Sequence, residues 1–287
     1  MPELKLDSPP AGLRTDARTG WLTAPAVEPS PGELWLLSWN NEEPVAALVT
    51  AAREDYVLAM PVTFNLDEAG PDEVVLEADA LGLPAVIWNR AETGLGTFLL
   101  QRRVAVAVAA PQLQSIRRSA ASGVSDPALL HGDADSASTF ESVAARFAEL
   151  CFVEWPAVQS GERILNTDVL AAAGIDAQTF AARTGFGPAP VLALWSGETI
   201  RPEQVDAVDS ALGQIAEAAV VVPDDFVIAE LRRPQWKDSV ARIAQHHHID
   251  ERAARELVRA DVALAARTDS LSERRRTAVA DAIARLL

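Results

Sequence analysis

The stretch Gly174–Gly197 reads GIDAQTFAARTGFGPAPVLALWSG and has the pattern of two short helices joined by a turn. Its apolar positions have the spacing that two small crossed helices need for a shared core: Ile175, Phe180, Ala181 and Val191. Gly185 stands at the expected turn. Because a proline disrupts a helix beyond its first turn, Pro190 restricts the second helix to about Ala189–Trp195. We therefore expect a compact helical domain with a short second helix.

Over about residues 161–222 this pattern resembles the helix-turn-helix of the lambda-repressor-like (XRE-type) family. In that family the second helix carries polar side chains to the edges of the bases. The corresponding positions here have no side chain that can donate or accept a hydrogen bond: Gly187, Pro188, Ala189, Pro190, Leu192 and Ala193. They cannot form the bidentate contacts that distinguish base pairs. The resemblance implies the fold without sequence-specific reading of DNA by this helix.

The second helix carries an apolar set instead: Val191, Leu192, Leu194 and Trp195. Trp195 stands where the XRE pattern usually has a glutamate before the final glycine. Exposed apolar patches of this kind commonly bind protein. We therefore expect a protein partner or a second copy of the chain at this face. The alternative is that Trp195 belongs to the core of its own domain.

Residues 31–110 consist of short apolar runs separated by turn residues. Five of these runs have strand length and β-prone residues: Gly32–Trp39, Val45–Thr50, Tyr56–Thr63, Glu73–Leu76 and Ala85–Trp88. Their spacing is typical of a small, strongly bent antiparallel barrel.

The order of the motifs GELWLLSW, EPVAALVT, VLAMPVTFN and LGLPAVIW resembles the PemK/MazF toxin barrel over about residues 31–110. That family cleaves single-stranded RNA without a metal, using an arginine before the proline of the second strand and a threonine at the end of the third. Thr63 matches the threonine, but Glu43 stands at the arginine position, before Pro44. A carboxylate there would repel the phosphate, on which negative charge develops during cleavage. We expect a catalytically silent barrel, with Glu43 facing Thr63 across its groove.

The fold class that we expect is α+β and multidomain, with the barrel followed by helices. The expected parts in chain order are a flexible arm at 1–30, the barrel at 31–125, a linker at 126–137, the helix-turn-helix domain at 138–222 and a C-terminal helical segment at 223–287. The further expected helices run from Ser138 or Thr139 to about Glu154, from Pro202 to about Ala219, and over Gln235–His246, Asp250–Arg267 and Ser270–Leu287, the last with a Ser270/Glu273 capping box.

The net charge of −16 argues against broad contact with nucleic-acid phosphates. Residues 31–110 hold 12 acidic and 4 basic residues, and residues 223–287 hold 11 acidic and 12 basic residues. Any nucleic-acid contact would therefore involve the C-terminal segment, where Arg274, Arg275 and Arg276 cluster. The alternative for these arginines is a solvated helix face.

No motif of the chain predicts a metal or another cofactor. His246, His247 and His248 are consecutive, so a helix would direct them about 100° apart, which suits no single metal ion. The chain has one cysteine, Cys151, and no apolar run that approaches 18 residues. These features predict a cytoplasmic protein without membrane contact.

These observations predict a non-catalytic regulatory protein in transcriptional or toxin–antitoxin-type control that acts through protein–protein contact. One alternative is a metal-independent single-stranded RNA endonuclease of MazF type that uses Thr63. A second alternative is a DNA-binding transcriptional repressor whose contacts come from the C-terminal arginines. Cleavage of RNA that depends on Thr63 would support the first alternative, and a salt-dependent shift of duplex DNA the second.

Overall fold

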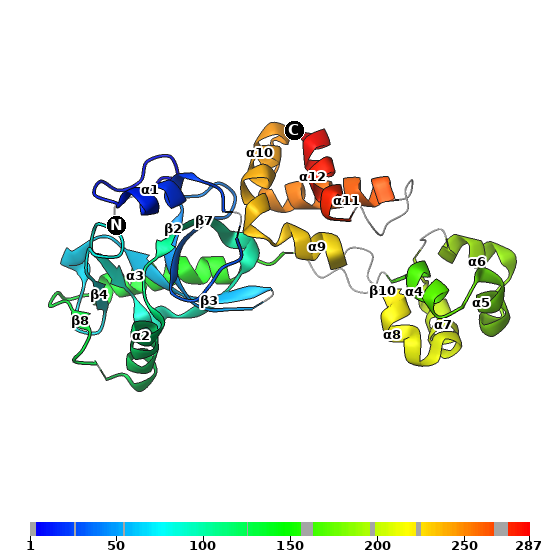
Figure 1. Ribbon diagram of the computed structural model, residues 1–287, viewed down its shortest axis with the longest axis horizontal. Coiled ribbons are helices and arrows are strands. Elements are labelled where there is room, and N and C mark those ends of the chain that lie inside the picture. The colour runs from blue at the N-terminus through cyan, green and yellow to red at the C-terminus, as the bar shows by residue number, and fades with distance from the viewer. Residues whose placement is uncertain are drawn as a thin grey trace. The chain divides into compact units, whose positions relative to one another are not determined.

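The computed structural model describes residues 4–25, 27–53, 55–124, 126–155, 163–195, 199–221, 225–266 and 275–287. The protein is α+β, with an N-terminal antiparallel sheet followed by helices (Figure 1). Its contacts divide the chain into two compact units. We call them the sheet unit, with Met1–Glu154, Leu231–Arg255 and Leu287, and the helical unit, with Trp155–Glu230 and Glu256–Leu286. The C-terminal segment expected at 223–287 is therefore shared between the two units.

The sheet unit is built on eight strands, all paired antiparallel: β1 Glu33–Leu37, β2 Val45–Ala52, β3 Tyr56–Thr63, β4 Val74–Leu76, β5 Ala85–Ile87, β6 Thr93–Gly96, β7 Leu100–Val106 and β8 Leu130–His131. They follow the order β7-β1-β2-β3-β5-β4-β8, and β6 also pairs with β3. Within the described residues this path does not return to β7, so the sheet is open. The antiparallel sheet is confirmed, and the closed barrel is not.

The strands form where apolar runs pack both faces of the sheet. All five residues of β1 are buried, as are the first six of β2. A register shift between Val49 and Ala51 interrupts the pairing of β2 with β3. Such bulges increase the bend and twist of a strand. On its other edge, the long strand β3 pairs with β5 at its end and with β6 at its beginning.

Within the segment expected to be a flexible arm, the described residues include a helix that packs on the sheet. Helix α1 (Thr15–Leu22) packs against β7, and Ala17 and Trp21 have no exposed surface. The indole N–H of Trp21 donates to the carbonyl of Lys5 at 2.9 Å. A side chain at Gly20 would come within 2.3 Å of the carbonyl oxygen of Arg103, so only glycine allows this close approach. Helix α1 has only eight residues, which is too short to give a clear apolar periodicity in the sequence.

Two helices complete the N-terminal part of the sheet unit. Helix α2 (Ala110–Ser122) contacts the short 3-10 helix η2 (Asn89–Ala91), and α3 (Ala137–Cys151) packs against β6. The residues expected to be a linker include β8, which pairs with β4. This segment is therefore bound to the sheet. Helix α3 begins one residue after Ser136, slightly before the expected start.

The remaining helices of this unit come from the C-terminal part of the chain. After the 3-10 helix η6 (Pro234–Trp236), α10 (Lys237–His247) packs against β7. Helix α11 (Glu251–Ala266) begins in this unit, and its residues from Glu256 onward belong to the helical unit. Helix α12 (Arg275–Leu286) likewise belongs to the helical unit, and the expected capping box at Ser270 lies outside the described residues.

The part of the helical unit from β9 to β10 consists of short elements (Figure 1) that share one apolar core. They are β9 Ile164–Leu165, α4 Thr167–Ala172, α5 Ala177–Thr184, α6 Pro188–Trp195, η4 Pro202–Gln204, α7 Val205–Leu212, η5 Gly213–Ile215, α8 Ala216–Ala219 and β10 Val220–Val221. Helix α9 (Asp225–Leu231) follows, and its described residues are not part of this cluster. Gly185 ends α5 with a φ of 72°, as expected for the turn. The single helix expected from Pro202 to Ala219 is interrupted, because Gly213 ends α7 with a φ of 53°.

Candidate functional site

Thr63 and Glu43, the two residues that the sequence resemblance singled out, have their polar atoms engaged inside the sheet unit. Thr63, at the end of β3, is buried, and its Oγ1 accepts a hydrogen bond from the indole N–H of Trp88 at 3.0 Å. Glu43 lies just before β2, where its carboxylate accepts from the backbone N–H of Leu4 at 2.8 Å and pairs with Arg146 of α3 at 3.1 Å. The side chains expected to face each other therefore bond to other groups.

The apolar set on α6 divides between the core and the surface. Val191 and Leu194 are buried in the helical unit, so they cannot also form an exposed contact face. Trp195 is half-buried, and its ring lies 5.5 Å from that of Phe180. Leu192 is 72% exposed and is the member of the set that faces solvent.

The other residues singled out in the sequence give no site in the described part of the chain. Arg274 lies outside the described residues, and Arg275 and Arg276 lie at the start of α12 with side chains that are likewise not described. The rings of His246 and His247 lie 5.0 Å apart at the end of α10. No group of three potential metal ligands is found among the described residues. Nucleic-acid contact by the arginines stays a prediction.

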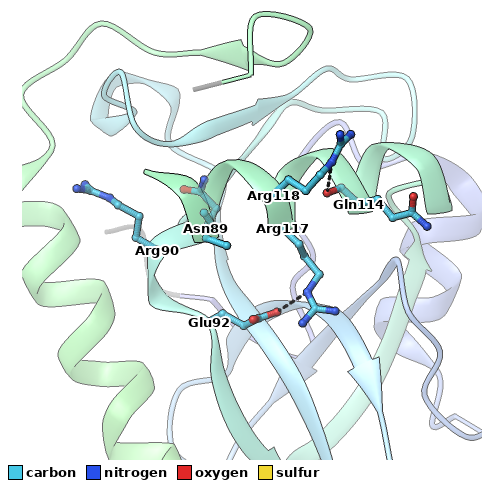
Figure 2. Close-up of a pocket in the computed structure, with 8 residues that line it drawn as sticks. Asn89, Arg90, Glu92, Gln114, Arg117 and Arg118 are labelled. Atoms are coloured by element: carbon cyan, nitrogen blue, oxygen red, sulfur yellow. Dashed lines mark hydrogen bonds and ion pairs between the residues drawn. The ribbon is translucent and has the colours of Figure 1, made fainter. Parts of the chain in front are cut away.

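An open groove of about 820 Å³ lies between η2 and α2, and we call it the arginine groove (Figure 2). Its lining is polar apart from two alanines: Asn89, Arg90, Glu92, Gln114, Arg117, Arg118, Ala120 and Ala121. Sequence reasoning missed this groove because its two sides are separated along the chain.

Local contacts determine how the first two arginines of the groove are held. Arg90 pairs with Asp72 at 3.0 Å and with Glu73 at 2.9 Å. Arg117 pairs with Glu92 through its Nε at 3.3 Å. The charges of both arginines are thus compensated by neighbouring carboxylates.

Arg118 differs from these two. It bonds to the hydroxyl of Ser115 at 3.0 Å and to the backbone carbonyl of Gln114, and Figure 2 shows its guanidinium directed away from that of Arg117. Within the described residues it forms no ion pair. Arg118 therefore gives the groove one uncompensated positive charge.

Asn89 carries a hydrogen-bond acceptor that has no partner in the described part of the chain. It is 2% exposed, and within the described residues its Oδ1 has no hydrogen-bond partner. Buried polar atoms are nearly always bonded, so an unbonded acceptor in the lining of a groove needs an explanation. Oδ1 of Asn89 is therefore a buried acceptor behind the groove, whereas Arg118 is an exposed cation at its surface.

One signal in the sequence could have indicated this region. No acidic residue occurs between Glu92 and Asp126, although the whole chain has a net charge of −16. The α2 segment within that stretch carries both Arg117 and Arg118. A local absence of acids in a strongly acidic protein marks a candidate anion-binding surface.

A second cluster of charges is buried between the sheet and the C-terminal helices of the sheet unit. The Nζ of Lys237 donates to the backbone carbonyl of Ser38 at 2.7 Å and to both carboxylate oxygens of Glu251 at 2.7 and 2.6 Å. Arg255 also bonds to Glu251, at 2.8 Å, and to the backbone carbonyl of Phe98.

Burial sets the electrostatics of this cluster. It lowers the pKa of Lys237 from 10.5 to about 8, and the charge of Glu251 only partly offsets this effect. Burial also lowers the pKa of Arg255. With its bonds inside the protein and 1–2% of each charged side chain exposed, this cluster fastens helices to the sheet and offers no access to a ligand.

Comparison of the chain with protein-family models and with curated proteins finds no match. The antiparallel sheet followed by helices agrees in general shape with the domains expected from the sequence. In the part of the chain that the structure describes, no helix is both long and apolar enough to span a membrane.

Proposed function

We propose that this chain is a non-catalytic regulatory protein of the cytoplasm that acts by binding a protein partner in transcriptional or toxin–antitoxin-type control. Within this proposal residues 31–125 are a PemK/MazF-like domain, and residues 138–222 are an XRE-like helix-turn-helix domain. The order of the strand motifs and the turn at Gly185 support these assignments.

The observation that carries the proposal is the engagement of Thr63. A hydroxyl that acts on a phosphate must reach it, whereas Oγ1 of Thr63 is buried and satisfies the indole N–H of Trp88. Moving the hydroxyl would leave that N–H unbonded, at a cost of about 1–3 kcal/mol. At the second family position Glu43 supplies a negative charge, which Arg146 neutralises. These contacts favour a structural role for Thr63 and Glu43 over a catalytic one.

The proposal is tested by incubating the purified chain with single-stranded RNA of mixed sequence at neutral pH. The RNA should remain intact, and Glu43→Arg should not restore cleavage, because Thr63 stays buried in that variant. Cleavage by the wild-type chain that disappears in Thr63→Val would contradict the proposal.

Stability measurements separate the structural role of Thr63 from a catalytic one. Thr63→Val should lower the free energy of unfolding by about 1–3 kcal/mol, because it leaves the Trp88 N–H without an acceptor. Thr63→Ser keeps the hydroxyl and is the matched control, with a smaller loss. Equal losses in the two variants would show that the hydroxyl has no structural role.

A further inference from the structure

We propose that Lys237, Glu251 and Arg255 form a proton-linked latch that holds the segment Leu231–Arg255 on the sheet, weakly while Lys237 carries its proton and more tightly once the proton has left. The inference goes beyond the proposed function, which gives these three residues no role. It is carried by their geometry, since two cations share one carboxylate in the interior of the sheet unit.

The latch buries one positive charge in excess. Glu251 pairs with Lys237 at 2.6 Å and with Arg255 at 2.8 Å, and each of these side chains is 1–2% exposed. Asp238 also acts on the charge of Lys237, but it is partly exposed and pairs with Arg102 at 2.6 Å. One carboxylate thus compensates two buried cations. Because an uncompensated buried charge is costly, the closed segment is favoured by any change that removes the excess charge.

Lys237 is the group of the latch that can release a proton. A guanidinium keeps its proton in proteins, and protonation of Glu251 would add to the excess charge. Burial lowers the pKa of Lys237 from 10.5 to about 8, although the charge of Glu251 acts in the opposite direction. The neutral amine keeps two N–H donors, so it can still bond to the carbonyl of Ser38 and to Glu251. Release of the proton therefore removes the excess charge and keeps both attachments.

The same residues fasten the turn between β1 and β2. Lys237 donates to the carbonyl of Ser38 at 2.7 Å, directly after β1. The backbone N–H of Glu251 donates to Oδ1 of Asn40 at 2.9 Å, and a carboxylate oxygen of Glu251 accepts from the N–H of Asn40 at 3.3 Å. Asn40 has a φ of 51°, which is uncommon outside glycine. Opening of the latch therefore releases this turn together with α10 and the start of α11.

The segment can open while the sheet remains folded. The apolar cluster that contains Leu36, Leu48 and Met60 draws its described members from residues 13–129, outside the segment. Proteins commonly open in local units of this kind at a lower cost than global unfolding. In the open form Lys237 is in water and has its ordinary pKa of 10.5. Between pH 8 and pH 10.5 opening therefore takes up a proton and becomes less favourable as the pH rises.

Hydrogen exchange followed by mass spectrometry at pH 7 and pH 9 tests the latch in the full chain. The protection of each region is its slowing relative to the unfolded chain at the same pH. At pH 7 the amides of α10 should be at least about tenfold less protected than those of β3, because the segment opens without the sheet. From pH 7 to pH 9 the protection of α10 should rise about tenfold, as follows from a pKa of about 8 in the closed form and 10.5 in the open form. Equal protection of α10 and β3 at pH 7 would overturn the inference, as would a protection of α10 that stays constant or falls.

The chain has two lysines, Lys5 and Lys237, which gives a matched control. Lys237→Met should abolish the rise in the protection of α10 between pH 7 and pH 9, whereas Lys5→Met, at an exposed position, should keep it. A rise that persists in Lys237→Met, or that disappears in Lys5→Met, would contradict the assignment of the proton to Lys237.

Nuclear magnetic resonance of the chain labelled at lysine Cε gives a second readout, which does not depend on the folding of Lys237→Met. In Lys5→Met the single lysine signal belongs to Lys237, and its chemical shift should change with a midpoint near pH 8. If the midpoint lies at pH 10 or above, the closed latch keeps the proton and the inference is wrong.

Discussion

Lys237, Glu251 and Arg255 place two cations around one carboxylate in the interior of the sheet unit. Each of the three side chains is 1–2% exposed. Removing charged groups from water is costly, and the cost is offset only while each charge keeps its partner. The carboxylate serves two cations, so the three residues contribute unequally to stability.

Glu251→Gln is therefore expected to destabilise the protein more than Lys237→Met. The first variant leaves two buried cations without a carboxylate, at a cost of about 3–5 kcal/mol. The second leaves Glu251 paired with Arg255 and also removes the desolvation cost of the lysine. Urea unfolding of the three proteins at neutral pH measures the difference. A larger loss in Lys237→Met would show that the lysine, and not the carboxylate, holds the cluster together.

The lowered pKa of Lys237 predicts a pH dependence of stability with a definite sign. Between the folded pKa of about 8 and the ordinary value of 10.5, the unfolded chain binds a proton that the folded chain has released. The stability of the wild type relative to Lys237→Met should therefore rise from pH 8 to pH 10, by no more than about 2 kcal/mol. Glu251, Arg255 and Asp238 are the charged groups that act on the lysine. If the relative stability falls between pH 8 and pH 10, the interpretation that burial lowers the pKa of Lys237 is wrong.

At the scale of elements, α6 has one side in the core of the helical unit and one exposed leucine. Trp195→Arg should lower the melting temperature of this unit, because the indole packs against Phe180 and a charge would replace it. Leu192→Arg should leave the melting temperature unchanged, since Leu192 is 72% exposed. If α6 binds a second copy of the chain, Leu192→Arg should also shift the sedimentation profile toward the monomer. A stability loss in Leu192→Arg equal to that in Trp195→Arg would contradict this division of the helix.

Elements set by local pattern could be predicted from the sequence. The apolar runs around Leu36, Leu48 and Met60 form strands in which these three residues share one core, and the alternate residues are buried on the other face of the sheet. Gly185 marked the turn between α5 and α6, because a glycine most readily adopts its positive φ. Helix α7 ends at Gly213, earlier than expected, because the positive φ of this glycine ends the helix although the apolar periodicity continues.

Features that depend on distant contacts could not be predicted in this way. The burial of Trp21 depends on β7 and on the carbonyl of Lys5, neither of which is near it in the sequence pattern. Thr63 could be placed at a strand end, but its hydroxyl meets an indole that follows a different strand. The arginine groove likewise needs η2 beside α2. Pairings of this kind come from tertiary packing.

At the scale of the whole molecule, the sheet unit is discontinuous in sequence. Its C-terminal segment Leu231–Arg255 is joined to the sheet by η6 and α10 against β7 and by the bond from Lys237 to the carbonyl of Ser38. The helical unit has an apolar cluster of its own. Separate cores predict that unfolding of this chain is not a single two-state transition.

Calorimetry of core variants tests this division. Val240 of α10 has no exposed surface, so Val240→Ala should lower the stability of the sheet unit by about 2 kcal/mol. It should shift the same thermal transition as Leu36→Ala in β1, which removes a fully buried residue of the sheet core. Phe180→Ala, in the helical unit, should instead shift the other transition. Val240 lies closer in sequence to the helical unit than to β1, so sequence proximity alone would couple it to Phe180. If Val240→Ala moves the transition that responds to Phe180→Ala and leaves that of Leu36→Ala in place, α10 belongs energetically to the helical unit and the discontinuous sheet unit is wrong.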